Sequence, residues 1–199
     1  MSRAAVVGAA LATLAVTACG NRAATNPVPA TSVPAAEMRV LAASTIPYLP
    51  STTTVLTTTE LGKDAPIPGL AGKIASWGYL DGRERTFQGE SRRLTTVISR
   101  SLVFRSATGA RRYVAFVRAH ATQYFGVATG VGSLTSEGRT GWVFSPPPCA
   151  CHLANPVLVG VLDDGSNVVW LDINGPKATR ALLVQLLAQS ASAPATVAG

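Results

Sequence analysis

The amino terminus constrains this chain most, because it joins a single positive charge to a short uncharged apolar stretch. Arg3 precedes residues 4–18, which are rich in alanine and contain no charged side chain. A membrane-spanning helix needs roughly 20 apolar residues, and this stretch is shorter. Its length and position are typical of the core of an export signal. We therefore expect residues 1–18 to be a signal peptide that is removed from the mature protein.

The end of this stretch reads Val16-Thr17-Ala18-Cys19 and resembles the lipobox of bacterial, actinobacterial-type lipoproteins. The leucine that usually opens a lipobox is Val16 here. The resemblance implies that a diacylglycerol is attached to the thiol of Cys19, and that cleavage leaves Cys19 as the acylated (palmitate-type) amino terminus. We expect a protein anchored by lipid on the extracytoplasmic face of the cell membrane. The alternative is an ordinary secretory signal followed by an incidental cysteine.

We expect residues 19–60 to form a tether between this anchor and a folded domain. They are rich in Ala, Thr, Pro and Ser, and such a composition buries too little apolar surface to offset its ordering entropy. Proline keeps such a chain extended and semi-rigid. A strand over residues 53–58 is the competing interpretation, because Val55 and Leu56 interrupt the threonines. Residues 191–199 form a second segment that we expect to be disordered.

A single domain is expected over residues 61–190. Apolar and β-branched runs predict strands over 74–80, 94–104, 157–162 and 168–173. Asp163-Asp164-Gly165-Ser166 separates the last two runs and predicts a hairpin, with Trp170 on the face opposite Val169 and Leu171. Gly175-Pro176 is expected to open a final helix over 177–188.

The clearest helix is predicted over residues 107–125. Its apolar positions recur at helical spacing and form one stripe: Tyr113, Phe116, Val117, His120, Ala121 and Tyr124. Ser106 or Thr108 can cap its start, and Gly126 follows as a stop signal. His120 lies on this stripe and is expected to be a packed or rim histidine rather than a ligand or a base.

The order of these elements predicts an α+β fold, an antiparallel sheet with helices packed on one face. This layout is similar to that of small exported α+β domains in actinobacterial lipoproteins, including Mog1/PsbP-like ones. The similarity is one of layout, without a shared motif, and no function is transferred through it.

Cys149-Ala150-Cys151-His152 is the most unusual local sequence, and it follows three prolines. An exported chain meets oxidising conditions, in which Cys149 and Cys151 can form a strained disulfide. A redox-active pair assisted by His152, a metal site, and free or intermolecular thiols are the other interpretations. Zinc sites usually need a wider cysteine spacing and a further ligand, so we expect neither a metal nor a cofactor.

Positive charge gathers in one part of the sequence. Nine arginines lie between residues 83 and 118: Arg83, Arg85, Arg92, Arg93, Arg100, Arg105, Arg111, Arg112 and Arg118. Only Glu84 and Glu90 oppose them in this range. The whole chain carries 17 Lys and Arg against 10 Asp and Glu. One interpretation is a solvated basic surface without a specific partner. The other is a binding surface for an anionic envelope component, with Arg111, Arg112 and Arg118 on one helix.

No catalytic pattern stands out. The motif Gly-x-Ser-x-Gly is absent, Gly130-Val131-Gly132 lacks the third glycine of a dinucleotide loop, and Asp163, Asp164 and Asp172 do not match a calcium loop. Nucleic acid is a poor partner outside the cell. We expect a non-enzymatic, membrane-anchored extracytoplasmic module that binds a small ligand or an envelope partner. The alternative function is thiol-redox or metal handling by the Cys-x-Cys-His loop.

Overall fold

Seven strands form one sheet in the order β1-β2-β3-β7-β6-β5-β4, and every neighbouring pair is antiparallel. The computed structural model describes residues 39–127, 129–147 and 155–192. The strands are β1 (Ser51–Val55), β2 (Tyr79–Gln88), β3 (Thr96–Phe104), β4 (Gly130–Ser136), β5 (Arg139–Ser145), β6 (Val157–Asp164) and β7 (Asn167–Asn174). The central strands β3, β7 and β6 therefore lie between the antiparallel pair β1–β2 and the hairpin β4–β5.

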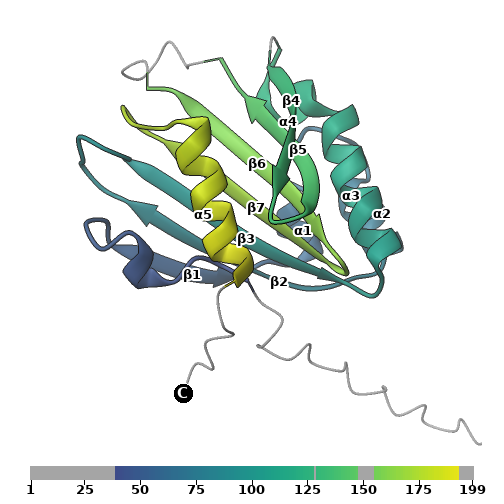
Figure 1. Ribbon diagram of the computed structural model, residues 1–199. Coiled ribbons are helices and arrows are strands. Elements are labelled where there is room, and N and C mark those ends of the chain that lie inside the picture. The colour runs from purple at the N-terminus through teal and green to yellow at the C-terminus, as the bar shows by residue number, and fades with distance from the viewer. Residues whose placement is uncertain (1–38, 128, 148–154, 193–199) are drawn as a thin grey trace, which may run out of the picture. The chain divides into compact units, whose positions relative to one another are not determined.

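Helices cover both faces of this sheet (Figure 1). They are α1 (Thr58–Leu61), α2 (Leu70–Ser76), α3 (Ala107–Ala119), α4 (Ala121–Phe125) and α5 (Arg180–Ser192). Each face of the sheet has its own buried cluster. One cluster contains residues of α1, α2 and α3, and the other contains residues of α5. The predicted α+β class with an antiparallel sheet is confirmed. The helices do not share one face, however, because the central strands are apolar on both sides.

The hairpin β6–β7 is confirmed, and it shows why both faces need cover. Gly165 lies in its two-residue turn with φ of 64°, a conformation that glycine adopts without strain. Along β7, Val168 and Trp170 enter the cluster under α3, whereas Val169 and Leu171 enter the cluster under α5. Trp170 thus faces away from Val169, as predicted, yet it is buried too.

The long predicted helix forms as two helices. Ser106 caps α3, because its hydroxyl accepts a hydrogen bond from the backbone N–H of Gly109 at 3.2 Å. The chain breaks at His120, and α4 follows it and ends before Gly126. The predicted stripe faces the sheet, with Tyr113 and Val117 fully buried.

The strand predicted over residues 74–80 is wrong. Residues Leu70–Ser76 form α2, and β2 starts only at Tyr79. Gly78, with φ of 82°, turns the chain between helix and strand. The run Ile74 to Leu80 is short and mostly apolar, so its pattern does not distinguish a helix turn from a strand.

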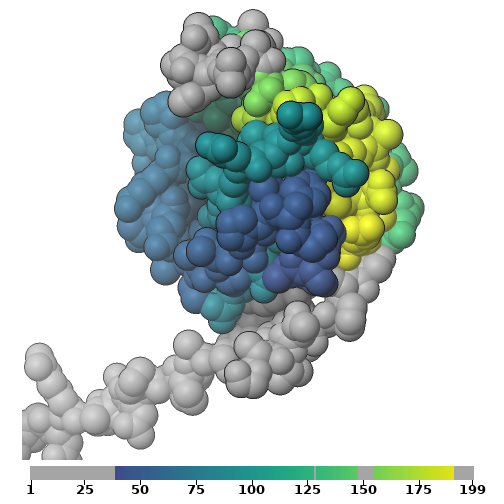
Figure 2. Space-filling view, turned by 90° about the vertical axis from the view of Figure 1, so that its left-hand side faces the viewer, coloured from purple at the N-terminus to yellow at the C-terminus, as the bar shows by residue number. Residues whose placement is uncertain are grey.

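The predicted boundary of the tether is also wrong, because the folded domain begins near residue 39 rather than 61. Leu41, Ile46 and Leu49 are buried in the cluster under α5. The backbone N–H of Leu41 donates to Ser99 Oγ at 2.9 Å, and Arg39 pairs with Asp164. Figure 2 shows this first part of the domain, in purple, packed beside α5, in yellow. Each apolar residue here is isolated in sequence and gains its burial only from the sheet.

The rest of the early segment joins the sheet edge. β1 pairs with β2 over its whole length, which confirms the competing strand interpretation for residues 53–55, whereas Thr58 already begins α1. At the other end, α5 runs from Arg180 to Ser192 and so extends past the predicted start of the tail at residue 191. The hairpin β4–β5 was not predicted. Within the described residues, no helix has the length and apolar character needed to cross a membrane.

Candidate functional site

A shallow groove of about 370 Å³ lies between α3 and the β4–β5 hairpin. From α3, Arg111 and Ala115 line it, and from the hairpin Ser133, Thr135 and Trp142 do so. The rest of its lining is mixed: Val114, Leu134 and Gly141 are apolar, Thr140 adds a hydroxyl to those of Ser133 and Thr135, and Asp163 adds one carboxylate. Because β4 is an edge strand, the face of it that points toward α3 stays exposed beyond the helix.

Two of the three predicted arginines flank this groove. The guanidinium of Arg118 lies over the ring of Trp142, at 3.8 Å from the ring centre. Arg111, about two helical turns earlier on α3, lines the groove. Arg112 is exposed on α3 but does not line the groove. None of the three forms an ion pair with a described residue. Positive charge is therefore available to an anion at this groove.

The other arginines of the basic run do not join this surface. Arg85 donates to the carbonyl of Leu41 at 2.6 Å and to Thr53 Oγ1 at 2.9 Å. Arg93 lies 5.9 Å from the ring centre of Tyr48, at the far end of β2 and β3. The run of positive charge in the sequence is thus dispersed over the sheet edge, the β2–β3 turn and α3.

Arg100, unlike the exposed arginines of α3, is largely buried and forms ion pairs with two carboxylates. Its Nε donates to Glu84 Oε2 at 2.6 Å, and its Nη1 donates to Asp64 Oδ2 at 2.8 Å. All three side chains are less than one-fifth exposed. The guanidinium also lies 5.4 Å from the ring centre of Trp170, the residue opposite it on β7. This arrangement ties the α1–α2 segment to the sheet.

Further polar groups without partners surround Arg100. Asp172 lies on the same face of β7, and it makes no hydrogen bond or ion pair with a described residue. Burial raises the pKa of its carboxyl to about 6, although the charge of Arg100 opposes this shift. The hydroxyls of Tyr113 and Tyr124 are buried and have no hydrogen-bond partner among the described residues. Burial raises the pKa of both, so both stay protonated.

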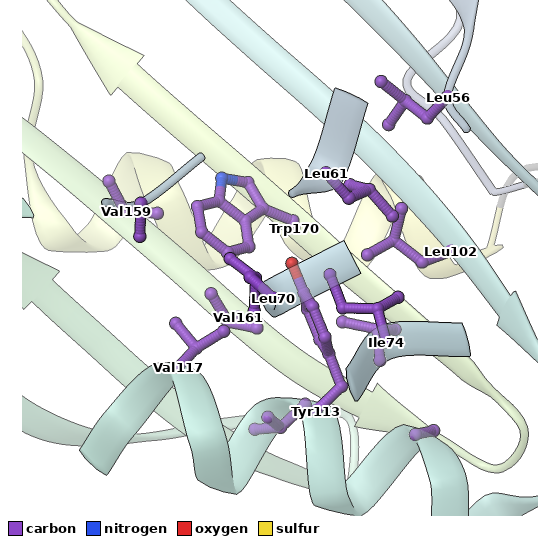
Figure 3. Close-up of a cluster of buried hydrophobic side chains, with 14 of the residues drawn as sticks. Leu56, Leu61, Leu70, Ile74, Leu102, Tyr113, Val117, Val159, Val161 and Trp170 are labelled. Atoms are coloured by element: carbon purple, nitrogen blue, oxygen red, sulfur yellow. The ribbon is translucent and has the colours of Figure 1, made fainter. Parts of the chain in front are cut away.

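Figure 3 shows the position of one of these hydroxyls. Tyr113 rises from α3 and points its oxygen toward Trp170, between Leu70 and Val161. A buried hydroxyl without a partner costs free energy relative to water, so this part of the core is not packed for stability alone.

The cluster around Arg100 was missed in the sequence, although a signal for it exists. Arg100 interrupts the β-branched run of β3, and Asp172 follows the apolar run of β7. A charged residue inside a strand that is buried on both faces needs a partner. From the sequence, Arg100 is counted with the basic run, and Asp172 is considered only as a residue of the hairpin that does not complete a calcium loop.

The other predicted residues are placed as follows. His120 stacks on Phe116 with 3.8 Å between ring centres, and its Nδ1 lies 2.9 Å from the carbonyl oxygen of Phe116, so it is a rim residue as predicted. Cys19 and the loop with Cys149, Cys151 and His152 lie outside the described residues. Within the part of the chain that the structure describes, no three His, Cys, Asp or Glu side chains are arranged to hold a metal.

Comparison with known proteins adds little at this point. No family model matches the chain, and no curated protein matches it. The extracellular domain of PknH from Mycobacterium tuberculosis, a solved structure, is 15% identical to this chain and has a TM-score of 0.36. The alignment covers 71% of this chain and 80% of that domain. A similarity at this level does not establish a shared fold or function.

Proposed function

We propose that this protein is a lipid-anchored extracytoplasmic module that binds the anionic headgroups of a membrane surface through the groove beside α3. The observation that carries the proposal is a pair of arginines: Arg111 lines this groove, and Arg118 lies over Trp142 of its lining. Neither forms an ion pair with a described residue, and one carboxylate, that of Asp163, lines the groove beside them. Both interiors of the domain are filled by side chains, and the groove is open and shallow. These features favour surface recognition over enclosure of a small molecule.

The groove has the chemistry of a headgroup site. Guanidinium groups bind phosphate with paired hydrogen bonds, and the hydroxyls of Ser133 and Thr135 can donate to the same phosphate oxygens. Val127, which follows α4, is 78% exposed, and Val131, on the β4 strand that contributes Ser133 and Thr135 to the groove, is 45% exposed. An exposed valine on this strand suits the boundary between headgroups and acyl chains.

The expected anchor strengthens such weak contacts. Residues 20–38 precede the described domain, and an extended chain of this length reaches about 60 Å at roughly 3.1 Å per residue. The domain can then contact the membrane that holds its own lipid. Tethering of this kind gives an effective concentration of the order of millimolar, so each arginine needs to contribute only about 1 kcal/mol.

The binding step is tested with the mature chain carrying Cys19→Ser, which cannot be acylated. We expect it to sediment with vesicles that contain phosphatidylglycerol and not with vesicles of phosphatidylcholine alone. Arg111→Gln together with Arg118→Gln is expected to weaken binding about thirtyfold, because two surface charges are lost. Arg92→Gln together with Arg93→Gln removes the same charge at the β2–β3 turn and serves as the control. Equal weakening by both pairs would show that net charge, not the groove, drives binding.

The anchoring step has a separate readout. Mass spectrometry of the protein from its own membrane is expected to find Cys19 as an acylated amino terminus, and Cys19→Ala is expected to release the protein or leave its signal uncleaved. An intact Met1, or an unmodified Cys19 on a membrane-bound protein, would overturn the anchor and leave the groove as a separate question.

A further inference from the structure

We propose that Asp163 makes the groove beside α3 selective for headgroups that join a phosphate to a polyol, such as phosphoglycerol or phosphoinositol. This inference rests on the proposed function and names the kind of headgroup that the groove takes. Its starting point is the one carboxylate of a groove that is lined and flanked by arginines. A site for phosphate alone gains nothing from a carboxylate, because the two negative charges repel each other.

Asp163 and Asp164 follow each other at the end of β6 and differ in their contacts. Asp164 accepts a hydrogen bond from Arg139 Nε at 2.8 Å and also pairs with Arg39, so it fastens the start of the domain. Asp163, which is half-buried, forms no hydrogen bond or ion pair with a described residue. The hairpin turn does not use it either, because the turn consists of the two residues after Asp164. Asp163 therefore has no structural partner in the described part of the chain.

Arg111 and Asp163 line the same groove, one from α3 and the other from β6, yet they do not pair. The guanidinium and the carboxylate thus remain two separate binding groups, one that donates hydrogen bonds and one that accepts them. A ligand that carries an anion at one end and hydrogen-bond donors at the other can contact both. A polyol phosphate has this arrangement, because its phosphate oxygens accept and its hydroxyls donate.

Two threonines extend the carboxylate into a polar row across three neighbouring strands. Thr135 on β4 pairs with Thr140 on β5. Gly141 pairs with Leu162, so Thr140 and Asp163 are the next residues of β5 and β6. Both threonines and Asp163 line the groove. Neighbouring strands lie about 4.8 Å apart, so a headgroup with several hydroxyls can contact more than one member of this row.

The rest of the lining favours hydroxyls over an ammonium group on the ligand. Threonine hydroxyls both donate and accept, as polyol hydroxyls do, whereas an ammonium group only donates. Ala115, Leu134 and Trp142 add apolar surface, against which the C–H groups of a polyol can pack. The groove of about 370 Å³ has room for glycerol or inositol together with its phosphate.

The first test uses the mature Cys19→Ser chain and vesicles in which one anionic lipid is mixed with phosphatidylcholine at a fixed mole fraction. We expect phosphatidylinositol and phosphatidylglycerol to bind about fivefold more tightly than phosphatidic acid, which has no polyol, or phosphatidylserine, which offers an ammonium group. Charge alone predicts that phosphatidic acid binds best, because it is the most negative of the four. Equal binding of the four lipids, or tightest binding of either polyol-free lipid, would overturn this inference and leave the proposed function intact. Absence of binding to every anionic lipid would overturn both.

Asp163→Asn gives a second test, in which this inference and simple electrostatics predict opposite signs. The variant loses a negative charge, so electrostatics alone predicts tighter binding to every anionic vesicle. We expect instead about fivefold weaker binding to phosphatidylinositol, because an amide oxygen accepts hydrogen bonds from hydroxyls less strongly than a carboxylate does. Binding to phosphatidic acid should be retained, which also shows that the variant is folded. Glu90→Gln, an equal change of charge at the exposed β2–β3 turn, is the matched control. If Asp163→Asn changes binding only as Glu90→Gln does, the role of Asp163 is refuted.

A competition experiment separates the lipid headgroup from a free polyol phosphate, since the two share this chemistry. Inositol 1-phosphate is added to protein bound to phosphatidylinositol vesicles, with inorganic phosphate at equal ionic strength as the control. We expect inositol 1-phosphate to release the protein at a concentration about fivefold lower than phosphate requires. Equal release by both would mean that the groove recognises charge alone and would contradict the inference. Inositol 1-phosphate that binds without vesicles as tightly as the vesicles do would assign the groove to a soluble ligand and overturn its role at the membrane.

Discussion

The two faces of the sheet use the same two strands in different ways. Toward α5, β3 and β7 present only uncharged side chains: Val97, Ser99, Ser101, Val103, Val169, Leu171 and Ile173. Toward α3, the same strands present Arg100 and Asp172 beside Trp170. The α5 face is therefore built for stability, while the α3 face carries charge at a cost in stability. That difference locates candidate sites on the α3 side.

The largest expected effect is on the α5 face. Leu183 on α5 is fully buried, so Leu183→Ala leaves a cavity and should lower the free energy of unfolding by about 2–5 kcal/mol. Leu182, its half-buried neighbour, is the control and should lose distinctly less. Urea denaturation of both variants measures the difference. Equal losses would mean that α5 is not the stabilising layer described above.

The next effect has the opposite sign and lies on the α3 face. Asp172 has a pKa of about 6 in the folded chain and 3.8 as its ordinary value. The folded carboxyl thus holds its proton more tightly, and wild-type stability should fall as pH rises from about 4 to about 6. Asp172→Asn removes this titration and should stabilise the protein at pH 7 by up to about 3 kcal/mol.

The measurement is the unfolding free energy of wild type and Asp172→Asn at pH 4 and pH 7. At pH 4 the wild-type carboxyl is largely protonated when folded, so the two proteins should differ little. Asp163→Asn, at a half-buried position of the same hairpin, controls for net charge. Parallel pH profiles for wild type and Asp172→Asn would contradict the burial of this carboxyl.

The smallest effects compare two single hydroxyls. Ser99 accepts a hydrogen bond from the backbone of Leu41 on the α5 face, so Ser99→Ala should cost about 1–3 kcal/mol by leaving a buried N–H unpaired. The Tyr113 hydroxyl has no partner among the described residues, so Tyr113→Phe should be neutral or stabilising by about 1 kcal/mol. Thermal unfolding of the two variants checks the contrast. A loss in Tyr113→Phe as large as in Ser99→Ala would show that the hydroxyl has a structural role.

Local patterns in the sequence were sufficient for several elements of the fold. The hairpin turn at Gly165, the cap at Ser106 and the alternation along β7 depend on neighbours within a few residues. These features depend on neighbouring residues only, so they can be predicted without the rest of the chain. The run Ile74 to Leu80 was misjudged for the complementary reason, since it joins the last turn of α2 to the start of β2 and is too short to show either periodicity.

The candidate sites divide in the same way. The three exposed arginines of α3 could be named from the sequence, because helical spacing places them on one element. What Arg118 contacts was not predictable, since Trp142 belongs to a hairpin formed later in the chain. Arg100, Asp64 and Asp172 come from three separate segments: the pairing of β3 with β7 brings Asp172 to the face of Arg100, and the packing of the α1–α2 connection on the sheet brings Asp64.

The sequence by itself determined the α+β class and the amphipathic stripe of α3, because each depends on a contiguous pattern. The export signal and the lipobox rest on patterns of the same kind and stay predictions. Only the tertiary structure decided that residues 39–60 belong to the domain and that Arg100 is buried while Arg118 is exposed. Both outcomes depend on which distant segments cover a residue. Burial and charge pairing are properties of that packing, and no local pattern encodes them.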